Sequence, residues 1–155
     1  MKLEILKHQI DVQADKQLVW QAWTSKDQIT KWFANEAFIE ATEGGLYEVG
    51  FTYLGDGPTN KDCKILSIQP PSRIVFQWKI PVKKKFHLDE NLSTIVAVSL
   101  EEKDNQTIIK LFHSGWGEGE NWLQAKEWQM QAWEKSLSSL KSYIETGEGF
   151  LLWQA

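Results

Sequence analysis

The feature that most constrains the fold is the order of the elements that the sequence predicts. From Asp62 to Ser114 the chain reads as successive β-strands, and one long amphipathic helix then runs from about Gly119 to Gly147. The strands alternate apolar and polar side chains, which is typical of a sheet with one buried face. A curved sheet wrapped around a single long helix encloses a cavity, so this order predicts a binding protein.

Alternation of apolar residues predicts strands at residues 6–12, 47–53, 62–68, 73–80, 93–102 and 107–114. Two short helices are expected after the first strand, one with Asp15 as its N-cap and one that opens at the capping box Ser25–Gln28. The segment Pro81–Asn91 is predicted to be a surface loop. Together these elements predict an α+β fold: an antiparallel sheet of six or seven strands with the long helix across its concave face.

Composition limits the classes of function. A chain of 155 residues fits one domain, which we expect to span residues 1–155. Its 17 basic and 21 acidic residues give a net charge of −4, so nucleic acid is not an expected partner. The N-terminal residues alternate charged and apolar groups, which predicts neither a signal peptide nor a membrane span. Cys63 is the only cysteine, so we expect a cytoplasmic protein without an internal disulfide.

Aromatic residues are abundant: nine Trp, seven Phe and three Tyr are more than a small core needs as filler. Some of them are therefore expected to line a cavity or a contact surface. Trp78 shares an inward parity with Ile74, Phe76 and Ile80 on its strand, and Tyr47 is expected to face it from another strand.

Several short segments fall in the order found in a known family. These are Ile10-Asp11-Val12 before Val19-Trp20, Trp32-Phe33, Gly44-Gly45, Pro70-Pro71 with Arg73 and Phe76-Gln77-Trp78, Leu111-Phe112-His113-Ser114-Gly115-Trp116, and Trp133 with Leu137, Leu140 and Lys141. On these residues the chain resembles the helix-grip superfamily of START lipid-transfer domains, plant Bet v allergens and polyketide cyclases. Within it, the chain looks most like the branch named for activators of the heat-shock protein 90 ATPase.

The resemblance implies a START-like helix-grip domain that binds a small hydrophobic or aromatic molecule between the sheet and the long helix. An acidic group on that ligand would meet Lys126, which lies on the apolar side of the helix. We expect no cofactor, and no catalytic site because no spacing joins an acid to a base. A metal site is not expected either, because the histidines lack the spacing of metal ligands. Strand parity and helical spacing place the following residues on the pocket: Tyr47, Phe51, Trp78, Leu111, His113, Lys126, Met130 and Trp133.

Individual residues allow more than one interpretation. His113 is either a ligand or proton acceptor, or a histidine satisfied by the backbone at the sheet edge. Cys63 is expected to be a buried small hydrophobe, and Lys83–Lys85 a solvated stretch of loop. Trp128 falls on the polar side of the helix, where it forms either a homodimer contact or lies flat on the protein's own surface.

Two other functions are consistent with the resemblance. A co-chaperone would bind heat-shock protein 90 and stimulate its ATPase through an exposed, charge-complementary face. A cofactor-free cyclase or hydrolase needs a paired acid and base, for which the scattered candidates are His113, Lys126, Asp62 and Glu48.

Overall fold

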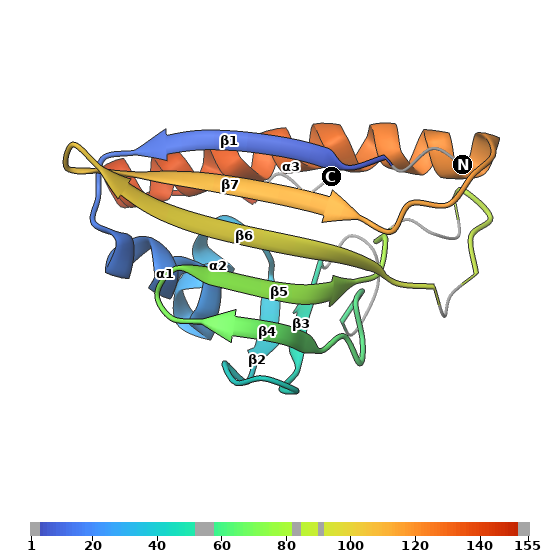
Figure 1. Ribbon diagram of the computed structural model, residues 1–155, viewed down its shortest axis with the longest axis horizontal. Coiled ribbons are helices and arrows are strands. Elements are labelled where there is room, and N and C mark those ends of the chain that lie inside the picture. The colour runs from blue at the N-terminus through green and yellow to red at the C-terminus, as the bar shows by residue number, and fades with distance from the viewer. Residues whose placement is uncertain (1–3, 52–57, 82–84, 90–91, 152–155) are drawn as a thin grey trace.

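The computed structural model describes residues 4–51, 58–81, 85–89 and 92–151 (Figure 1). It confirms the α+β class, with two short helices after the first strand and a long C-terminal helix. The elements in chain order are β1 (Leu6–Val12), α1 (Lys16–Thr24), α2 (Lys26–Trp32), β2 (Glu36–Ile39), β3 (Tyr47–Gly50), β4 (Ile65–Gln69), β5 (Arg73–Trp78), β6 (Thr94–Lys103), β7 (Gln106–Ser114) and α3 (Glu120–Thr146).

The strands form two antiparallel sheets. One has the order β1-β7-β6-β5-β4, and the other is the pair β2-β3. An isolated bridge between Leu46 and Lys64 links them, and the Ile65 N–H donates to the Gly45 carbonyl at 2.8 Å. The described part of the chain thus has seven strands, within the expected number, but they form a sheet of five and a sheet of two rather than the one sheet expected. β2 was not predicted because it is only four residues long and exposes Phe38.

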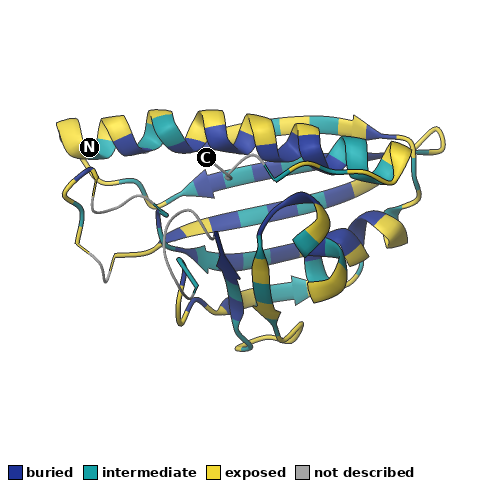
Figure 2. Cartoon of the chain, turned by 180° about the vertical axis from the view of Figure 1, so that it is seen from behind, coloured by how far each residue is buried: buried dark blue, intermediate teal, exposed yellow. Residues whose placement is uncertain are grey.

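The helices cover only one face of the larger sheet. α3 runs along the inner face beside β1, while α1, α2 and the β2-β3 pair cover the remainder of that face (Figure 1). Seen from behind, the buried residues of α3 form a stripe turned toward the strands (Figure 2). None of the helices in the described part of the chain is long and apolar enough to cross a membrane.

Local sequence sets the helix ends. The Asp15 carboxylate accepts the Leu18 N–H at 2.9 Å and so caps α1 as predicted. α2 begins next to Ser25 as expected, although the Ser25 side chain makes no capping hydrogen bond. α3 ends at Gly147, whose φ of 87° is a left-handed conformation that glycine adopts without a steric penalty.

Aromatic rings fill the space between the sheet and the helices. Phe33, at the end of α2, lies at the centre, with ring centroids 5.5 Å from Phe51, 5.8 Å from Trp78 and 5.6 Å from Trp133. Tyr47 stacks on Phe76 at 4.0 Å, and its hydroxyl donates to the Trp23 carbonyl at 2.7 Å. The polar tip of this buried ring is thus satisfied inside an otherwise apolar layer.

A buried side chain supplies hydrogen bonds to β3. Asn60 is fully buried; its Nδ2 donates to the Tyr47 carbonyl at 2.7 Å, and its Oδ1 accepts the Val49 N–H at 2.6 Å. One amide thereby satisfies two backbone groups on the side of β3 that faces away from β2.

The residues after α3 return toward α2. The Ser139 hydroxyl lies 2.7 Å from the carbonyl oxygens of both Trp32 and Phe150, and it accepts the Phe150 N–H at 2.8 Å. Gly149 lies so close to Lys31 and Trp32 that a Cβ there would meet the Lys31 carbonyl at 2.6 Å. This contact ties the end of the described chain to the helical layer.

Candidate functional site

Most of the residues predicted to line a pocket lie in the packed interior. They come from β3, the residue after it, β5, β7 and α3, they all face inward, and each is 1% exposed or less: Tyr47, Phe51, Trp78, Leu111, His113 and Trp133. The expected inward parity of these strands is confirmed. The rings contact one another, with Trp78 and Trp133 5.4 Å apart. A role for these residues in ligand binding stays a prediction.

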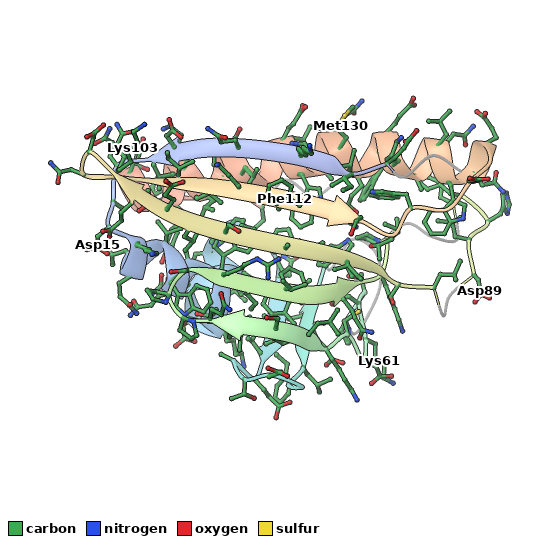
Figure 3. The ribbon with its side chains drawn as sticks, viewed as in Figure 1. Asp15, Lys61, Asp89, Lys103, Phe112 and Met130 are labelled. Atoms are coloured by element: carbon green, nitrogen blue, oxygen red, sulfur yellow. The ribbon has the colours of Figure 1, made fainter. Side chains whose placement is uncertain are left out.

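The predicted phase of α3 is wrong by one residue at its centre. Met130 is 37% exposed and lies on the outer side of the helix (Figure 3), whereas Gln129 is 1% exposed and faces the sheet. The Trp78 Nε1–H donates to Gln129 Oε1 at 3.1 Å. Trp133 packs on the large rings of the sheet and α2, and the other positions that α3 turns toward them are small or polar: Ala125, Gln129, Ala132 and Ser136. A pattern search for large apolar residues misplaces such a face.

His113 is held by side chains rather than by the backbone. Its Nδ1 lies 3.0 Å from the Trp133 indole nitrogen, and its Nε2 lies 2.6 Å from Thr94 Oγ1. Indole N–H is only a donor, so Nδ1 is the acceptor and the neutral ring carries its proton on Nε2. That proton goes to Thr94 Oγ1, whose own hydroxyl donates to the Trp78 carbonyl at 2.9 Å.

The electrostatics of His113 follow from this position. Burial and, to a smaller extent, the nearby His8 together lower its pKa to about 3. Burial also lowers the pKa of His8, against an opposing effect of Glu134. His113 is therefore neutral at pH 7. The other acid–base candidates lie elsewhere: Glu48 accepts the Asp62 N–H at 2.6 Å, between β3 and β4.

A pocket of about 430 Å³ lies at the N-terminal end of α3. It opens between the residues before β1, the β7–α3 connection and the first turns of α3. Two half-buried rings pack together there: Trp116 and Trp122 are edge to face with centroids 6.2 Å apart. The lining residues are Glu4, Trp116, Gly117, Glu118, Gly119, Glu120, Trp122, Leu123 and Lys126. Lys126 is the one residue that this lining shares with the predicted set.

Both tryptophans are fixed by their neighbours. The Trp116 ring lies 4.5 Å from the His113 ring, and its Nε1–H donates to the His113 carbonyl at 2.9 Å. The Trp122 indole packs against Gly117, where any Cβ would overlap the ring. The run Gly115-Trp116-Gly117-Glu118-Gly119 is thus the sequence signal for this site, and sequence reasoning gave these residues no role there.

Lys126 reaches the mouth of this pocket and pairs with a carboxylate. Its ammonium group forms an ion pair with Glu4, and its side chain is 18% exposed. An acidic ligand group would have to compete with Glu4 for this cation.

The remaining predicted residues lie apart from the pocket. Trp128 is half-buried and packs against the chain's own core, and its part in a homodimer stays a prediction. Cys63 is buried, as expected. Lys83 and Lys84 lie outside the described residues. Within the described ranges, no group of three or more His, Cys, Asp or Glu is arranged to hold a metal ion.

Comparison with solved structures supports the fold. The Aha1 dimer from Colwellia psychrerythraea superposes with a TM-score of 0.74 and 24% identity, over 94% of this chain and 99% of that one. CalU16 from Micromonospora echinospora has a TM-score of 0.71 and 22% identity, with 96% and 78% covered. An AHSA1-like protein from Rhizobium etli has a TM-score of 0.71 and 18% identity, with 94% and 84% covered.

A comparison with curated protein sequences finds no match. The family model for Activator of Hsp90 ATPase homolog 1-like protein, however, matches residues 13–145. This match extends from the end of β1 almost to the end of α3 and includes both tryptophans of the pocket. The chain therefore belongs to the Activator of Hsp90 ATPase homolog 1-like family and has its helix-grip fold.

Proposed function

We propose that this protein binds a small hydrophobic or aromatic molecule, and that the site is the pocket between the β7–α3 connection and α3. The observation that carries the proposal is the pair of tryptophan rings, Trp116 and Trp122, that pack edge to face in the wall of a pocket of about 430 Å³. Pockets of that size with aromatic walls are typical of small-molecule sites, and this one also has four charged side chains in its lining.

Exposure distinguishes this pocket from the interior. Leu123, on its wall, is 44% exposed, whereas Trp78 and Trp133 are buried with their indole N–H groups already bonded. A ligand in the interior would have to separate rings that are packed at 5–6 Å. A ligand in the pocket at the N-terminal end of α3 needs no such rearrangement.

The first test is a titration with a neutral probe, benzyl alcohol, followed by the indole N–H resonances in ¹⁵N-labelled protein. The nine tryptophans give resonances that single Trp→Phe variants assign. We expect shifts at Trp116 and Trp122 and none at Trp78 and Trp133. Native mass spectrometry of the purified protein serves as a search for a compound already bound.

Two variants of α3, one inside and one outside the pocket lining, test whether the probe binds at the proposed site. Trp122→Leu removes one wall and should abolish the shift at Trp116, whereas Trp128→Leu, on the same helix but outside the lining, should keep it. Shifts at Trp78 and Trp133 alone would show that the probe binds in the interior and not in the proposed pocket. Unchanged resonances up to the solubility limit of the probe would reject the proposal.

A second candidate is binding to a protein partner. The family model is named for activators of the Hsp90 ATPase, and one similar structure is an Aha1 dimer. A co-chaperone role would use an outer face of the molecule and no open pocket. The direct test is the ATPase rate of Hsp90 with excess protein; an unchanged rate together with no co-sedimentation would remove this candidate.

A further inference from the structure

The charges around the pocket indicate which molecules it selects. Among the described residues that line it, three are carboxylates, Glu4, Glu118 and Glu120, and one is a cation, Lys126. The Lys126 ammonium is already paired with Glu4. Glu118 and Glu120 are exposed, and the described lining residues include no cation besides Lys126, so the described side chains give the pocket a net charge of −2.

We infer that the pocket selects an organic cation: a small molecule with an ammonium group attached to, or near, an aromatic or aliphatic body. This inference rests on the proposed function and narrows it. It replaces the expectation of an acidic ligand group, because such a group would have to displace Glu4 from Lys126 and face two further carboxylates.

The tryptophan rings favour the same class of ligand. The faces of aromatic rings carry negative potential, and Trp attracts cations more strongly than Tyr or Phe does. Trp116 and Trp122 are both half-buried and both line the pocket, so part of each ring is accessible to a molecule bound there. An ammonium group next to such a face keeps its positive charge partly solvated while its apolar body contacts Leu123.

One feature opposes a cation. The N-terminus of α3 begins at Gly119, which has no capping side chain, and a helix N-terminus carries about half a unit of positive charge. Glu120 in the first turn offsets that charge. The total charge around the pocket stays negative, because the half unit of positive charge at the helix N-terminus is smaller than the two units of net negative charge on the lining side chains.

The test compares three probes with the same ring and different charges: benzyltrimethylammonium, benzyl alcohol and phenylacetate. Dissociation constants come from the indole N–H shifts of Trp116 and Trp122. We expect the cation to bind about tenfold tighter than the alcohol, and the anion to bind most weakly. The ratio of cation to alcohol affinity should fall toward one in the double variant Glu118→Gln, Glu120→Gln.

Glu127→Gln is the matched control, because Glu127 is an exposed carboxylate of α3 that lies outside the lining. It should keep the wild-type ratio. Equal binding of the cation and the alcohol at Trp116 and Trp122 would overturn the inference and leave the proposed function standing. Preference for phenylacetate would also overturn it. No shift with any of the three probes would reject both.

Discussion

The Trp133 indole N–H donates to His113 Nδ1 across 3.0 Å, so a hydrogen bond joins the middle of α3 to the inner face of β7. Both groups are buried, and the other nitrogen of His113 is bonded to Thr94 on β6. This contact fixes the tautomer of the histidine and the rotation of α3 at the same point.

Trp133→Phe should lower the free energy of unfolding by about 2–4 kcal/mol, since it removes buried ring volume and leaves His113 Nδ1 without its donor. Trp133→Ala should cost about 3–5 kcal/mol. Urea denaturation monitored by circular dichroism measures both. Trp122→Phe, at the half-buried pocket, should cost less than about 1 kcal/mol. An unchanged midpoint for both Trp133 variants would contradict the packing described.

The stability should fall with acidification below pH 6.5. His113 has a pKa of about 3 in the folded protein and about 6.5 in the unfolded chain, so between these values only the unfolded chain binds the proton. The free energy of unfolding then decreases by about 1.4 kcal/mol per pH unit once the unfolded histidine is mostly protonated. Burial of His8 contributes with the same sign.

Urea denaturation at pH 7.5, 6.5 and 5.5 tests this dependence. His113→Gln should have a smaller loss of stability between pH 7.5 and 5.5 than the wild type. His87→Gln, an exposed histidine, should keep the wild-type loss. If the free energy of unfolding changed with pH equally in His113→Gln and in the wild type, His113 would not be the group responsible for the loss of stability in acid.

Gln129→Leu should lower the free energy of unfolding by about 1–3 kcal/mol. The substitution retains a side chain of similar size but leaves the buried Trp78 N–H without an acceptor. Gln131→Leu, two residues along on the exposed side of α3, should change it by less than about 0.5 kcal/mol. Equal stabilities of the two variants would contradict the observed orientation of α3.

Ser139→Ala should release the end of the described chain from α2. The Phe150 amide loses its acceptor, so its hydrogen exchange should accelerate at least about tenfold, which corresponds to about 1.4 kcal/mol of lost protection. Ser138→Ala removes only a hydroxyl that bonds back to Glu134 on the solvent side, and it should leave that amide protected. Exchange as slow as in the wild type would contradict the Ser139 contact.

The fold was predictable because its signals are periodic. The alternation in β5 and β7 and the 27-residue length of α3 gave the elements and their inner faces. β2 escaped because a four-residue strand with an exposed phenylalanine has too little pattern to detect. The rotation of α3 was misjudged near Met130 because the sheet and α2 supply the large rings, leaving Gln129 as the inward residue.

The pocket was less predictable than the fold for a different reason. Its walls come from three segments that are distant in sequence or irregular: Glu4, the glycine-rich connection before α3, and the first turns of α3. No periodicity describes such a connection. Only the close approach of Trp122 to Gly117 in three dimensions reveals why glycine occurs there.

Asn60 has a consequence for how copies of this protein meet each other. Exposed strand edges are templates on which a second polypeptide can add, but the side of β3 away from β2 is already covered by the segment around Asn60: the Tyr47 N–H donates to the Cys63 carbonyl at 2.8 Å and the Thr59 N–H donates to the Val49 carbonyl at 2.9 Å. The Asn60 carboxamide occupies the carbonyl of Tyr47 and the N–H of Val49 on that side. Its two hydrogen bonds complete the pairing of this margin, so the backbone N–H and carbonyl groups of Tyr47 and Val49 on that side are all occupied within the chain and are not available to a strand from a second copy.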